Sequence, residues 1–205
     1  MPSSIDIASQ ALILLRANTI SSFADDSNEA QIVNVIYTDF ITSLLSQYPW
    51  TFATKKRLLN QETGTPLNEY SYIHIVPAEA LLVWALFDNS NINTSPVRDY
   101  DIYGSASGRR VYSNYSTLYA DYTFYADEST WHPTFTDFAI SALAARLAMP
   151  VTGDLQLADY YRNIAYGSQQ GNSKGGLLGL AMSTDSKQKR NEYIFSDPLT
   201  NARFS

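Results

Sequence analysis

The chain of 205 residues contains no cysteine, few charged residues and no long hydrophobic run. Without cysteine it can form neither a disulfide nor a thiolate metal site. Charged residues make up 17% of the chain and the formal net charge is −6, whereas a surface that binds nucleic acid or an anionic membrane needs excess positive charge. No apolar run reaches the roughly 18 residues that cross a membrane, and the first residues lack a signal-peptide pattern. These absences predict a folded protein that is made in the cytoplasm and has no membrane attachment.

The sequence also lacks the common motifs of catalysis. It has no phosphate-binding glycine loop before a helix, no GxSxG elbow and no HExxH pair. Its two histidines are His74, in a strand pattern, and His132, at the start of a helix pattern. Both positions favour structural roles, so we expect no catalytic residue, no cofactor and no metal ion.

Two carboxylate pairs leave one enzymatic alternative open. Asp99 and Asp101 share one face of a predicted strand, and Asp127 and Glu128 precede Trp131. Two carboxylates near aromatic rings suit glycoside hydrolysis, in which they flank a sugar bond. With 20 acidic residues in the chain, such pairs also arise by chance.

The strongest local signal is a long helix followed by an aromatic stop. Residues 26–29, DSNE, read as a capping box in which an Asp oxygen accepts from first-turn amides. Apolar residues then recur at three- and four-residue steps and predict a helix over 28–47. Pro49 ends it, and Trp50 and Phe52 supply two large apolar anchors.

Three more helices are expected around this one. The first covers residues 5–16. The second opens at residues 131–133 and closes at Met149–Pro150, with alanines that allow close helix packing. In the third, Asp154 caps a helix that runs to about residue 170.

Between the helices the apolar period changes to that of strands. Residues 58–59 and 70–76 read as strands, and residues 99–114 read as a β-hairpin with a turn at 104–108. The apolar run at 81–87 has the length of a strand, with a short buried helix as the alternative. Residues 118–125 alternate with aromatics on both faces, which predicts either a sheet contacted on two sides or tyrosines on a wet face. The basic run at 55–57 reads as a solvated bend, with a phosphate contact as the alternative.

These patterns predict an α+β fold with three parts. Residues 1–54 and 127–172 form an antiparallel helical bundle, and residues 55–126 form an inserted, aromatic-rich antiparallel β-sheet. Residues 173–205 form an extended, flexible arm that cannot bury much by itself, with only a short apolar piece at 177–182.

Four stretches of the sequence resemble a known family. They are ALILLRANTISSFADDSNEA, QYPWTFA, IVPAEALLVW and FTDFAISALAARLAMPVTGDLQLADYY. Together they are similar to the head–tail adaptors of short-tailed bacteriophages, also called tail tubular protein A. The resemblance covers residues 8–171.

The resemblance implies a structural protein of the virion neck. Such adaptors form a ring, typically of twelve copies, that joins the portal protein above to the tail nozzle or tube below and lets DNA pass through. The ring is assembled in the host cytoplasm, and the adaptor is not an enzyme. The alternative is another neck or minor tail assembly protein.

By the same resemblance, the C-terminal arm reaches the portal and the sheet faces a neighbouring subunit or the tail protein. The expected portal anchors are Tyr193, Ile194, Phe195, Leu199 and Phe204. The expected contact residues of the sheet are Tyr103, Tyr112, Tyr119 and Tyr125.

Overall fold

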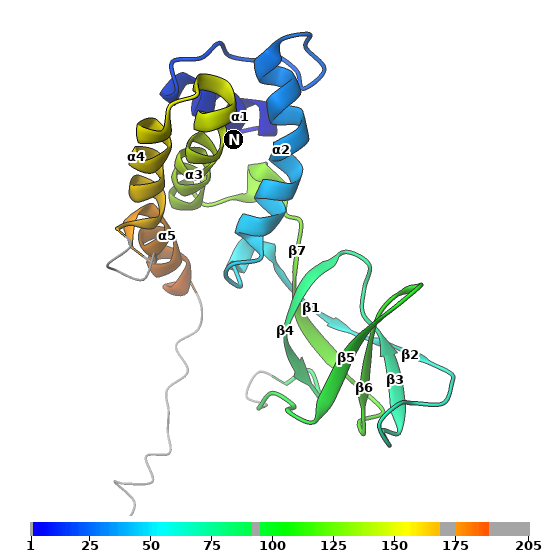
Figure 1. Ribbon diagram of the computed structural model, residues 1–205. Coiled ribbons are helices and arrows are strands. Elements are labelled where there is room, and N and C mark those ends of the chain that lie inside the picture. Colours follow the sequence, from blue (N-terminus) through cyan, green and yellow to red (C-terminus); the bar gives the residue numbers. More distant parts are fainter. Residues whose placement is uncertain (1, 92–94, 169–174, 189–205) are drawn as a thin grey trace, which may run out of the picture.

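The computed structural model describes residues 2–91, 95–168 and 175–188. Over these residues the fold is α+β, with five α-helices and seven strands in two antiparallel sheets. Figure 1 shows the helices gathered at one end of the molecule and the strands at the other. The expected mixture of helices with an inserted antiparallel β region is confirmed, but the strands form two sheets rather than one.

The first two helices begin at serine caps. Helix α1 (Ser4–Leu14) has a capping box between Ser3 and Asp6. Helix α2 (Asn28–Leu45) begins at Ser27, whose Oγ accepts from the Ala30 amide at 3.2 Å. The expectation that an Asp of the 26–29 word caps this helix is therefore wrong, because the chain enters the helix one residue later than Asp26.

Helix α3 (Pro133–Thr152) lies at the centre of the helical part and contacts the other four α-helices. It continues past Pro150, where the sequence predicted its end. A proline in the last turn removes one amide donor but does not prevent later bonds, and the Gly153 amide still donates to the Met149 carbonyl at 3.0 Å. Gly153, at φ 69°, ends the helix in the left-handed conformation.

The last two described helices pack together. Helix α4 (Leu155–Tyr166) is capped by Asp154, as predicted, and ends four residues earlier than expected. Helix α5 (Gly176–Ser186) follows and contacts both α3 and α4. At Gly176, φ is 58° and a Cβ would lie 2.4 Å from the Ile164 carbonyl oxygen, so this junction requires glycine.

Helix α5 lies within the segment expected to be a flexible arm. Its buried residues are Leu178, Ala181 and Asp185, three and four positions apart on one side of the helix. The sequence predicted only a short apolar piece at 177–182, because the serines and glycines around it have low helix propensity.

The aromatic stop after α2 is buried between the helices, as predicted. Trp50 is fully buried, and its ring lies 4.7 Å from that of Phe135 on α3. Phe52 lies 5.0 Å from the same ring. The stop therefore ties the end of α2 to α3 before the chain enters the first strand.

The described strands form two antiparallel sheets. One sheet has the order β1-β7-β4, with β1 (Thr54–Leu58), β7 (Tyr119–Phe124) and β4 (Ala80–Phe87). The other has the order β2-β3-β6-β5, with β2 (Asn60–Glu62), β3 (Tyr72–Ile75), β6 (Gly108–Ser113) and β5 (Tyr100–Ser105). Only Leu59 separates β1 from β2, and its amide donates to the Leu118 carbonyl at 2.8 Å.

Both sheets contribute to one small apolar core, which contains Leu86, Val111, Leu118, Ala120 and Tyr122. A second, larger core lies between the helices. Alternate residues of β7 therefore point into the β core, and the remaining ones form the opposite face of the three-stranded sheet.

Candidate functional site

The outer face of the β1-β7-β4 sheet carries a pocket of about 520 Å³. Lys56 on β1 pairs with Asp121 on β7, and Asp121 pairs with Ala85 on β4. These three positions form a row across the sheet. The residues that line the pocket come from this row, from the neighbouring strand positions and from the aromatic stop: Pro49, Thr51, Thr54, Lys56, Trp84, Ala85 and Asp121.

Asp121 gives the pocket a carboxylate that has an ion pair but no hydrogen bond at Oδ1. Its Oδ1 is buried and has no hydrogen-bond partner, and the Lys56 ammonium lies 3.9 Å away. Burial raises the pKa of Asp121, and the Lys56 charge opposes that shift. The Asp121 side chain is 30% exposed and lines the pocket, so a ligand with N–H groups can reach its carboxylate.

Trp84 forms the aromatic wall of the pocket. The pairing of β4 with β7 is irregular between Val83 and Ala85, so Trp84 sits at a bulge. Its Nε1–H donates to Thr123 Oγ1 at 2.6 Å, which holds the ring beside the outer face of β7. The sequence alternation of β7 identified this face, but the positions contributed by β1 and β4 were missed because they depend on strand pairing.

The basic run at 55–57 is part of strand β1 rather than a solvated bend. Each of its three cations lies near a carboxylate: Lys55 and Arg57 are 3.4 and 3.8 Å from Glu79, and Lys56 is 3.9 Å from Asp121. Two of them also lie over aromatic rings, at 3.9 Å for Lys55 and 3.7 Å for Lys56. The run is thus matched by Glu79, which precedes β4, and by Asp121 on β7, an arrangement that does not favour binding to phosphate.

The four tyrosines expected to form a contact surface lie in two places. Tyr103 and Tyr112 face each other on the β5–β6 hairpin, with ring centroids 5.7 Å apart. Tyr119 lies on the same face of β7 as Asp121. Tyr125 follows β7, and its hydroxyl donates to Glu128 Oε1 at 3.2 Å.

The carboxylates considered for glycoside hydrolysis make structural contacts. Asp101 accepts from Tyr103 and from Asn68, whose Nδ2 is 2.9 Å away. Asp99 accepts a longer bond of 3.4 Å from Asn114. The other pair lies in the 3₁₀ turn η2 (Glu128–Thr130) and its cap, which lead into α3.

Within η2, Asp127 accepts from the Ser129 amide at 2.9 Å. Glu128 is only 8% exposed and accepts from two tyrosine hydroxyls, Tyr37 on α2 and Tyr125. The Glu128 carboxylate therefore joins the helical and β parts.

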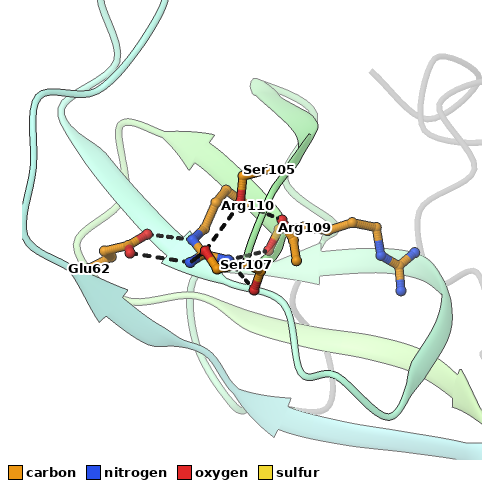
Figure 2. Close-up of polar contacts among 6 residues, drawn as sticks. Glu62, Ser105, Ser107, Arg109 and Arg110 are labelled. Carbon is orange, nitrogen blue, oxygen red and sulfur yellow. Dashed lines mark hydrogen bonds and ion pairs between the residues drawn. The ribbon is translucent and has the colours of Figure 1, made fainter.

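The charged cluster in Figure 2 braces the β5–β6 hairpin. The Arg110 guanidinium donates to Glu62 on β2 and to Ser107 in the turn, the latter at 2.8 Å. Arg109 points the opposite way and donates to the carbonyls of Ala80 and Leu81. The hairpin predicted at 99–114 is confirmed, although its strands extend to Ser105 and Gly108 and leave a shorter turn than expected.

A second polar cluster attaches α5 to the aromatic stop. Thr51 donates to Asp185 Oδ1 through both its backbone amide, at 2.9 Å, and its hydroxyl, at 2.7 Å. His132 Nε2 lies 3.3 Å from the Thr51 hydroxyl and 3.8 Å from Asp185 Oδ1. Because the hydroxyl already donates to the carboxylate, the histidine is not placed to activate it as a nucleophile.

The other histidine, His74, is fully buried, and its Nε2 is 2.9 Å from the Tyr115 carbonyl oxygen. The five expected portal anchors lie outside the described residues. Across the residues that the structure does describe, no helix is long and apolar enough to span a membrane. In the same residues, no three or more His, Asp or Glu side chains gather as a possible metal site.

No protein-family model matches this sequence, and no curated protein is significantly similar to it.

Proposed function

We propose that this chain is a structural adaptor of a bacteriophage virion, which forms a ring between the portal protein and the tail. In this proposal the helices form an antiparallel bundle that stacks on the portal, and the β part faces the tail nozzle or tube. The C-terminal arm reaches the portal. DNA passes through the ring without sequence-specific binding.

The observation that carries the ring proposal is that two helices on either side of α3 carry exposed apolar side chains. Helices α2 and α4 flank α3 (Figure 1). Val35 on α2 is 78% exposed, and Leu155 and Tyr160 on α4 are 61% and 58% exposed. A closed ring requires two different, complementary faces on each subunit, and we assign them to the exposed sides of α2 and α4.

The charges are consistent with a channel that does not retain DNA. The chain has a net charge of −6, and the cations of β1 are each within 4.0 Å of a carboxylate. Affinity for DNA rises with the number of phosphates that a protein neutralises. A ring of such subunits would therefore offer little electrostatic resistance to passing DNA.

The ring proposal can be tested by changing each exposed face separately and measuring the mass of the assembly. Val35→Glu should disrupt the α2 face and Tyr160→Glu the α4 face, so each variant alone should remain monomeric. Gln10→Glu, an equal change of charge at an exposed position of α1, should assemble like the unchanged chain.

Mixing the two disrupted variants distinguishes a ring interface from a symmetric dimer. Each variant retains the face that the other has lost, so a head-to-tail interface predicts dimers in the mixture and no larger species. Unchanged assembly of Val35→Glu and Tyr160→Glu would refute this choice of faces.

The portal proposal needs a separate binding experiment. The full chain and a chain ending at Gln188 would be sedimented with the portal ring of the same phage. The cut follows α5 because Asp185 is 1% exposed and belongs to the folded part. Saturable binding of the full chain alone supports the adaptor and its arm, whereas equal binding of both refutes the arm. If neither binds, the alternative of a neck or minor tail assembly protein is favoured.

A further inference from the structure

The pocket on the β1-β7-β4 sheet opens close to the last described residues of the chain. Thr51 lines the pocket and donates two hydrogen bonds to Asp185 in the final turn of α5. The described chain ends three residues later, at Gln188. Residue 189 therefore follows within about one helical turn of a side chain that contacts the pocket wall.

The pocket has the chemistry to bind a basic and aromatic peptide. Asp121 Oδ1 is a buried acceptor without a hydrogen-bond donor, and Trp84 supplies an aromatic wall. Among the described residues that line the pocket, the one cation is Lys56, which lies over the Phe87 ring and 3.9 Å from Asp121. A guanidinium suits such a carboxylate because it is always charged and carries several N–H donors.

The sequence that follows Gln188 contains both basic and aromatic residues. It reads KRNEYIF, with Lys189 and Arg190 first and Tyr193, Ile194 and Phe195 after them. Three neighbouring strands span roughly 10 Å. Seven extended residues span roughly 23 Å, which is enough to cross the sheet face.

We propose that the pocket is a peptide-binding site whose occupant is residues 189–195 of the same chain, with Arg190 paired to Asp121 and the Tyr193–Phe195 aromatics packed on Trp84. This assignment does not depend on the ring or on the portal. If the adaptor proposal also holds, these aromatics leave the pocket when they bind the portal, and the pocket keeps them covered before assembly.

The absence of cysteine permits a direct test in the full chain. Ser196→Cys provides a single site for a bimane label, whose fluorescence is quenched on contact with tryptophan. Trp50 and Trp131 are 0% and 6% exposed, so Trp84 is the quencher that a docked segment would reach. We expect the label to be quenched in the folded chain and most of the quenching to be lost in Trp84→Phe.

Two pairs of variants test the ionic contact. Arg190→Gln and Asp121→Asn should each relieve the quenching, whereas their matched controls Arg203→Gln and Asp101→Asn should not. Circular dichroism would confirm that each variant remains folded. The quenching should be independent of protein concentration.

Three results would overturn the proposal. The first is quenching that survives in Trp84→Phe, and the second is equal quenching in Arg190→Gln and Arg203→Gln. The third is quenching that disappears on dilution, which would show that the segment binds a second copy. Loss of portal binding does not affect any of these readings, so the two proposals can fail separately.

Discussion

The buried carboxylate of Glu128 should account for a measurable part of the free energy of unfolding. Tyr37 is 3% exposed and its hydroxyl lies 3.1 Å from Glu128 Oε1, while the Tyr125 hydroxyl lies 3.2 Å from the same oxygen. Burial, together with the Glu128 charge, raises the pKa of both tyrosines. Both hydroxyls therefore stay protonated and can donate to the carboxylate.

Tyr37→Phe removes one donor and leaves the ring in place. Hydrogen bonds to charged groups contribute about 1.5–3 kcal/mol, and we expect a loss in this range because Tyr37 is only 3% exposed. Tyr125 is 38% exposed, so water can replace its hydroxyl, and Tyr125→Phe should cost about 1 kcal/mol or less. In the double variant the carboxylate has neither donor, so the loss should exceed the sum of the single losses.

Urea unfolding measures these free energies directly. The slope of the transition should stay constant if only native-state contacts change. Tyr160→Phe is the matched control, since Tyr160 is 58% exposed on α4. A Tyr37→Phe loss within about 0.5 kcal/mol of that control would refute the assigned role of Glu128.

Three further predictions concern other buried polar groups. Burial lowers the pKa of His74 below 6.5, so the unfolded chain binds the proton more readily; stability should fall as pH drops below about 6.5, by at most about 1.4 kcal/mol per pH unit, and the difference in slope from His74→Gln measures it by urea titration at several pH values. Thr51→Val removes one of the two bonds that Thr51 donates to Asp185 and should cost about 1–3 kcal/mol, with faster amide exchange in α5 as the local readout. Arg110→Lys loses the two-nitrogen contact with Glu62 and should lower the melting temperature by a few degrees, corresponding to about 1 kcal/mol.

The features that were predicted correctly are those with a local cause. Trp50 is buried, as its size suggests, although α2 ends at Leu45, two residues before the predicted end and four before Pro49. Asp154 caps α4 through its own side chain. Each of these effects depends on residues within one helical turn, so it can be predicted from the local sequence.

The predictions that were wrong concern features that depend on a second, distant part of the chain. Asp26 and Ser27 are both good caps, and only the path of the preceding chain selects the serine. Helix α5 depends on burial of Leu178 and Ala181 against α3 and α4 rather than on its propensity. Likewise, one aromatic β region became two sheets because strand pairing is non-local and the chain changes sheets at Leu59.

The same limit explains why the pocket could not be predicted. Lys56, Trp84 and Asp121 are far apart in the sequence, and only the antiparallel registers of β1 and β4 with β7 place them on one face. In isolation Lys56 reads as a solvated charge and Asp121 as one acidic residue among 20. Once the strands are paired, the basic run is matched by carboxylates, and a buried oxygen of Asp121 is left without a donor. A binding role for this sheet face thus depends on cross-strand neighbours, and it should respond to substitutions at Asp121 and Trp84 rather than to the charge of the run.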